Sequence, residues 1–131
     1  MLVVRALSLI EIIREVADAR KIVAGKLDGR KLQNVKGEVD YKALVAGRLE
    51  LAATYELDGG GHTVEAERAL TGEKAAIRID GKAMANPDVD LEGSPNGLTK
   101  YAVKYILQCE DPLGTPHEMR LYAYVNVADL P

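Results

Sequence analysis

The sequence predicts an α+β domain, in which an N-terminal helix packs on a curved, mainly antiparallel sheet or a partly closed barrel of six or seven strands. Apolar residues recur at helical spacing only near the N-terminus. Later stretches alternate between apolar and polar residues, with the period of two that is typical of a strand with one buried face. Glycine-containing turn sequences separate these stretches and predict hairpins, and residues 1–131 together suit a single domain.

The N-terminal helix is expected over about residues 9–20. Ser8 and Glu11 form a capping box, because the Ser8 hydroxyl can accept from a free helix amide and the Glu11 carboxylate, three residues later, can accept from the backbone amide of Ser8. Acidic residues near the start and basic residues near the end suit the helix dipole. The helix can also extend over 9–24, with Gly25 as its terminating residue.

A long hairpin over residues 42–70 is the strongest pattern in the chain. Its first strand alternates from Lys42 to Leu57, and the glycine-rich tip after it supplies the positive φ angles that a reversal needs. Sixteen extended residues would span about 50 Å, which exceeds a domain of this size. The strand is therefore expected either to bend at Gly47 around a barrel or to project as a two-stranded arm.

The other elements are expected to be mostly strands. They are, in chain order, a strand over 21–27 as the alternative to a longer helix, a weak strand over 31–39, a hairpin turning at Asp80-Gly81, a loop over 86–97 rich in turn formers, and a C-terminal hairpin over 98–127.

The composition excludes several function classes. The net charge of −3 argues against a general nucleic-acid binder, which normally carries a basic face. Charged residues interrupt the apolar N-terminal run, so we expect no signal peptide, no membrane span and a cytoplasmic location. Cys109 is the single cysteine, which excludes an intramolecular disulfide, and its alternating apolar surroundings predict a buried side chain.

No catalytic, metal or cofactor site is predicted. The sequence lacks the nucleophile-elbow and phosphate-binding glycine motifs. His62 and His117 have no ligand spacing that would bring them together. The acidic loop that begins at Asn86 resembles a calcium loop in its alternating oxygens, but Leu91 and Gly97 occupy the positions that require Gly and Glu.

Four residues are weak candidates for contact with a ligand or partner. Arg68 lies on the apolar face of its strand, where it could hold an anion or sit at the sheet edge, and the edge is preferred because arginine is seldom buried unpaired. Tyr122 and Tyr124 share the polar face of the last strand, where partner contact and core packing are equally compatible with the pattern. Tyr55 would stand at the mouth of a cavity if the sheet closes.

The leading functional hypothesis is a non-catalytic structural or protein-interaction module, which self-assembles through strand edges or the projecting hairpin and forms a homo-oligomer or binds a protein partner. Components of phage and other particles are similar in kind, which is an analogy only. The alternative is a small-ligand-binding protein or enzyme with an apolar cone-shaped cavity, as in ketosteroid-isomerase-like folds.

Residues 21–25, which read Lys-Ile-Val-Ala-Gly after the expected helix, resemble the Gln-Val-Val-Ala-Gly segment of cystatins. The resemblance implies a fold in which an antiparallel sheet wraps a helix, and an activity as an inhibitor of cysteine proteases. It covers about twenty residues, and the chain departs from the family because it has Lys21 in place of Gln and no Trp for the Pro-Trp hairpin.

Overall fold

The structure is a computed structural model that describes residues 21–69, 71, 74–96 and 100–126. Its elements, in chain order, are β1 (Ala24–Leu27), β2 (Arg30–Lys31), β3 (Gln33–Val39), α2 (Tyr41–Val45), β4 (Arg48–Leu57), β5 (Gly60–Ala69), β6 (Ala75–Ile79), β7 (Lys82–Ala83), β8 (Ala85–Asn96), β9 (Lys100–Glu110) and β10 (Pro116–Asn126).

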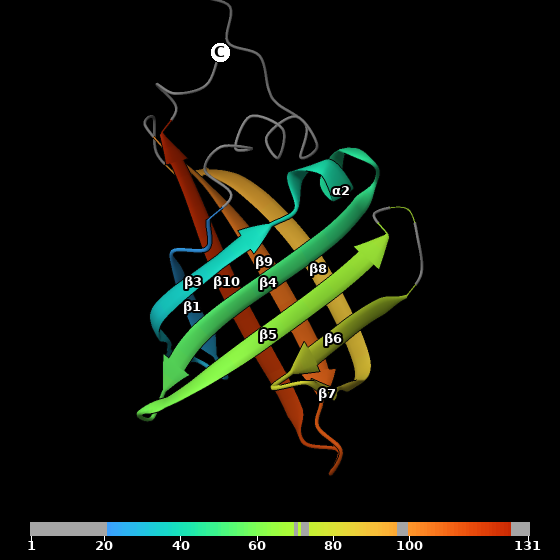
Figure 1. Ribbon diagram of the computed structural model, residues 1–131. Helices are drawn as coiled ribbons and strands as arrows, with labels where there is room; N and C mark the ends of the chain where they lie inside the picture. Colours follow the sequence, from blue (N-terminus) through green and yellow to red (C-terminus); the bar gives the residue numbers. More distant parts are fainter. Residues whose placement is uncertain (1–20, 70, 72–73, 97–99, 127–131) are drawn as a thin grey trace, which may run out of the picture.

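The strands form two antiparallel sheets of five strands each. Sheet A has the order β3-β4-β5-β6-β7, and sheet B has the order β2-β1-β10-β9-β8. Figure 1 shows the sheets as two layers whose strands cross. The two layers approach each other near β1 and β3 and again near β6 and β8. The amide of Ile22, just before β1, donates to the carbonyl of Gly37 in β3 at 3.0 Å, and β6 lies close to β8.

One apolar core fills the space between the two sheets. Each long strand alternates, and its inward residues are the buried ones, as a sheet with one covered face requires. Sheet A contributes Leu49, Leu51, Ala53, Tyr55, Val64, Ala66 and Ile77, and sheet B contributes Val89, Val103, Tyr105, Leu107, Cys109, Met119, Leu121 and Ala123. The predicted burial of Cys109 is confirmed.

The predicted α+β class is wrong. The described residues are nearly all sheet: 74% of them lie in strands, and the strands of this part of the chain form no closed barrel. The helix expected over 9–20 lies outside the described residues, and α2 is the one helix within them. The extension to residue 24 is also wrong, because β1 begins at Ala24. A sheet must cover its apolar face, and here a second sheet provides the cover that the prediction had assigned to a helix.

The central hairpin is shorter than predicted. Its strands are β4 and β5, paired from Arg48 opposite Ala69 to Leu57 opposite Gly60. Residues 41–45 form α2 instead, and the Asp40 carboxylate caps this helix by accepting from the amide of Ala43 at 2.9 Å. The first strand therefore has ten residues rather than sixteen and fits within the domain.

The loop predicted over 86–97 is a strand over most of its length. Residues 85–96 form β8, which pairs with β9 at the edge of sheet B. Pro87 and Pro95 have no N–H, which an edge strand tolerates because only one of its sides must pair. The register shifts between Ala85 and Asp88, where Asn86 has a φ of 49°, so a bulge absorbs the turn-forming residues.

Within the described ranges, no helix has the length and apolar character that crossing a membrane would require.

Candidate functional site

A groove of about 690 Å³ lies on the outer face of sheet A. Its residues come from β3, β4, β5, β6 and the start of α2. We call this the sheet A groove, and it is lined by Glu38, Val39, Asp40, Lys42, Glu50, Leu51, Ala52, Glu65, Ala66, Glu67, Ala76 and Arg78. A volume in this range accommodates a small ligand or part of a peptide.

Strand pairing explains why the groove is hollow at its centre and charged on its walls. Ala52 lies between Glu38 on β3 and Glu65 on β5, since each is its partner across the sheet. The short alanine side chain leaves a depression, while the longer glutamate side chains stand on both sides of it. Ala76 on β6 has a glutamate partner on one side, Glu67 on β5.

The charge of the groove is strongly one-sided. Five of its side chains are carboxylates and two are cationic, which leaves an excess of three negative charges. Glu50 and Glu67 are direct cross-strand partners, and like charges in that position are destabilising. Arg48 offsets part of this by contacting Glu50 at 3.1 Å. The groove therefore concentrates negative charge on a sheet face at some cost in stability.

Arg68 ties the two sheets together. It projects from β5, and its Nη1 donates to the Asp88 carboxylate at 3.2 Å, to the Asp90 carboxylate at 3.3 Å and to the carbonyl of Val89, all on β8. The Arg68 side chain is 28% exposed. The partners of its Nη1 therefore belong to the protein itself.

Tyr55 lies in the core rather than at the mouth of a cavity. It is 3% exposed, and its ring stacks on that of His62, its partner on β5, with the centroids 5.4 Å apart. Burial, together with the nearby Asp80 and Asp28 carboxylates, raises the pKa of Tyr55 to about 12. His62 in turn contacts Asp80 at 2.8 Å, which joins β5 to the turn between β6 and β7.

Tyr122 is half-buried on the outer face of sheet B. It lines a hollow of about 230 Å³ with Lys26, Glu118 and Arg120. The backbone of Tyr124 continues the same strand opposite Ala102, but its side chain lies outside the described part of the structure. The three predicted contact residues whose side chains are described are not brought together: Tyr55 is in the core, Arg68 is between the sheets, and Tyr122 is on the outer face of sheet B.

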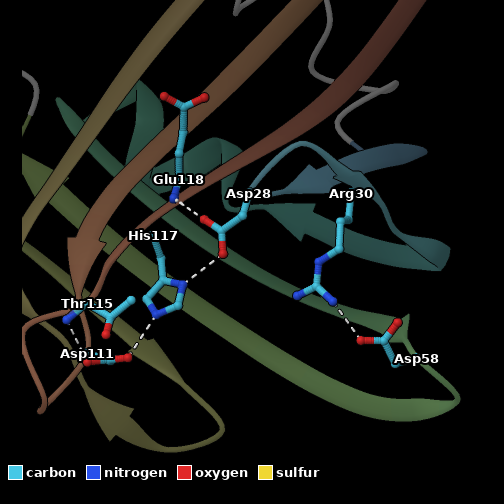
Figure 2. Close-up of polar contacts among 7 residues, drawn as sticks. All are labelled: Asp28, Arg30, Asp58, Asp111, Thr115, His117 and Glu118. Atoms are coloured by element: carbon cyan, nitrogen blue, oxygen red, sulfur yellow. Dashed lines mark hydrogen bonds and ion pairs between the residues drawn. The ribbon is translucent and has the colours of Figure 1, made fainter.

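A second polar cluster lies at one end of sheet B, where His117 stands between two aspartates (Figure 2). Its Nδ1 is 2.9 Å from the Asp28 carboxylate and its Nε2 is 3.0 Å from the Asp111 carboxylate. The hydrogen bonds to Asp111 and Asp28 raise the pKa of His117. The hydrogen bond from His117 holds the pKa of Asp111 below its usual value. Burial alone would raise the pKa of Asp28, but the bonds from His117 and the Glu118 amide lower it overall.

Nothing in the described ranges is arranged as a metal site: no three His, Cys, Asp or Glu side chains are placed to hold an ion. Inspection of the sequence missed both the sheet A groove and the aspartates around His117. Glu50, Glu65 and Glu67 of the groove do stand on the polar face of the predicted hairpin, but only the pairing of β3 to β6 reveals that the groove glutamates lie beside alanines.

Comparison of the chain with protein-family models, with curated proteins and with solved structures found no match.

Proposed function

We propose that this domain is a non-catalytic protein-interaction module, which binds a basic polypeptide segment of its partner in the sheet A groove. The observation that carries the proposal is the coincidence of a hollow with an excess of three negative charges on an exposed sheet face. A segment rich in Lys or Arg is complementary to such a face, and complementary charge favours both specificity and the rate of association.

The cross-strand pair Glu50 and Glu67 supports a cationic partner. Two carboxylates that face each other across a sheet repel, and a bound ammonium or guanidinium group between them would relieve that repulsion. Ala52 and Ala76 leave room between the glutamates for a peptide backbone or a long basic side chain to approach the sheet.

The character of the strand edges favours binding through a face. Three of the four edge strands are short or carry proline: β2 and β7 have two residues each, and Pro87 and Pro95 interrupt the donor groups of β8. The fourth edge, β3, has seven residues and no proline. Short and proline-bearing edges are a common means of preventing strand addition. The tip of the central hairpin is also held back on the domain, since Arg30 contacts Asp58 at 2.7 Å (Figure 2). These features give little support to assembly through edges or a projecting arm.

The proposal is tested by calorimetric titration of the full chain with a decalysine peptide, a decaglutamate peptide and a neutral Gly/Ser peptide at low and high salt. We expect binding of decalysine alone, weakening with salt because exposed charge pairs are screened. The double variant E65Q/E67Q removes two groove carboxylates and should weaken binding by roughly tenfold, from two partly exposed ion pairs.

The matched control is E56Q/E92Q, which removes two charges from glutamates that do not line the groove. Equal weakening in the two double variants would show attraction to net charge alone and would overturn the groove as the site. Light scattering of the same samples tests the alternative. If the chain is an oligomer and does not bind decalysine, this result would support self-assembly and contradict the proposal.

A further inference from the structure

His117 makes two hydrogen bonds that a neutral imidazole cannot make together. A neutral ring carries one N–H and one lone pair, whereas an imidazolium carries two N–H groups. Both carboxylates beside His117 can only accept when ionised, and they lie 2.9 and 3.0 Å from the two ring nitrogens. The arrangement therefore requires the protonated ring, since a neutral one would place a lone pair against a carboxylate oxygen.

Each aspartate also accepts from backbone amides with its other oxygen. Asp28, in the β1–β2 turn, accepts from the amide of Glu118 at 2.9 Å. Asp111, at the start of the β9–β10 turn, accepts from the amides of Leu113 and Thr115, each at 2.9 Å. The imidazolium of His117 thus connects two turns that belong to opposite ends of the chain, as Figure 2 shows.

Other titratable groups around His117 come from four elements. Cys109 on β9 is its cross-strand partner, and burial raises the pKa of that thiol, with the two aspartates adding to the effect. Arg30 on β2, whose guanidinium contacts Asp58, and Tyr55 on β4 both lie within electrostatic range of Asp28, and Glu118 follows on β10. The pKa shifts of Tyr55 and the thiol are upward, so neither adds a negative charge near neutral pH.

We propose that His117 is a pH-operated latch, which fastens the β1–β2 turn to the β9–β10 turn as an imidazolium and releases one of them when it loses a proton. The proton leaves to solvent from Nδ1 or Nε2, and the carboxylate facing the bare nitrogen then loses its donor. The inference does not depend on the sheet A groove, which lies on the other sheet.

The direction of the pH effect follows from the two kinds of group. Because the pKa of His117 is raised above 6.5, its contribution is fully present below that pH and disappears as pH rises through the raised pKa. The pKa values of Asp28 and Asp111 are lowered from 3.8, so their contribution is present above that pH and disappears as pH falls through the lowered values. The latch is closed between these limits.

The test is a proton NMR titration of the two histidine ring signals in the full chain, with H62Q used to assign them. We expect the His117 signal to titrate above pH 6.5, and to titrate at lower pH in D111N, which removes one partner charge but keeps an acceptor oxygen. A His117 signal that titrates at or below 6.5, or does not move in D111N, would refute the latch.

Amide hydrogen exchange provides a second readout. Above the His117 transition, the protection factors of the amides bound to the released aspartate, either Leu113 and Thr115 on Asp111 or Glu118 on Asp28, should fall several-fold relative to their values below it. In H117Q this pH-dependent step should vanish, while H62Q, which alters a histidine bonded to a single carboxylate, should keep it. A step that persists in H117Q contradicts the proposal, and the D111N titration decides the matter if H117Q does not fold.

Discussion

Gly37 shows how a single residue position controls the approach of two strands. It lies on β3 directly opposite Ala53, and a Cβ atom built there would be 2.6 Å from both the carbonyl oxygen of Ala52 and the Cβ of Ala53. Its own carbonyl accepts from the Ile22 amide at 3.0 Å, at the corner where the two sheets meet. Only glycine lets the backbones pass this closely without displacement.

Replacing Gly37 by Ala should therefore lower the free energy of unfolding by about 1–3 kcal/mol, the usual cost of overpacking. Urea unfolding followed by circular dichroism measures the change. The matched control is G61A, because Gly61 lies in β5 with nothing within 4 Å of its Cβ position and should accept Ala with little change. Equal stability of the two variants would contradict the close approach.

At the scale of the element, each sheet depends on a few contacts that fix it to its neighbour. The Asp-Gly turns set the hairpins locally: in β4–β5 the residues Asp58 and Gly59 have φ angles of 52° and 79°, as a two-residue turn of this hand requires. Contacts between the sheets join residues that are distant in the sequence: Arg68 on β5 donates to three groups on β8.

Replacing Arg68 by Met keeps the aliphatic stem and removes these bonds. We expect a loss of about 1–2 kcal/mol in the free energy of unfolding, since a half-buried arginine with several partners is worth more than an exposed pair. R48M is the control, because Arg48 is 62% exposed with one contact to Glu50, and it should change stability by less than about 0.5 kcal/mol. An equal decrease in the free energy of unfolding of the two variants would mean that the Arg68 contacts do not hold the two sheets together.

At the scale of the whole molecule, the two sheets share one core. Residues of sheet A such as Leu51 and residues of sheet B such as Leu121 belong to a single cluster of buried side chains. A sheet separated from its partner would expose its entire apolar face, so neither sheet is expected to remain folded alone.

We therefore expect urea unfolding to be a single cooperative transition. Because the chain has no Trp, its emission comes from six tyrosines, which include the buried Tyr55 and Tyr105, while circular dichroism reports on the strands. The two curves should coincide at pH 7. Separate midpoints would show that the sheets unfold independently, and that the shared core does not couple them.

The sequence by itself determined the local features: the alternation of the strands, the Asp-Gly reversals, and the inward positions that became the core. These depend on neighbours along the chain, through the period of two and the φ angles that Asp and Gly tolerate. It misplaced the strand over 85–96 because Pro and Asn indicate a loop locally, and only an edge position makes them acceptable.

Only the tertiary structure decided which element covers the apolar face of each sheet. Alternation shows that a strand has an apolar face, but a helix or a second sheet satisfies that face equally well, so the sequence could not choose between them. The groove and the His117 latch were hidden for the same reason. Glu38 meets Ala52 and Glu65 only through strand pairing, and Asp28 reaches His117 across 89 residues.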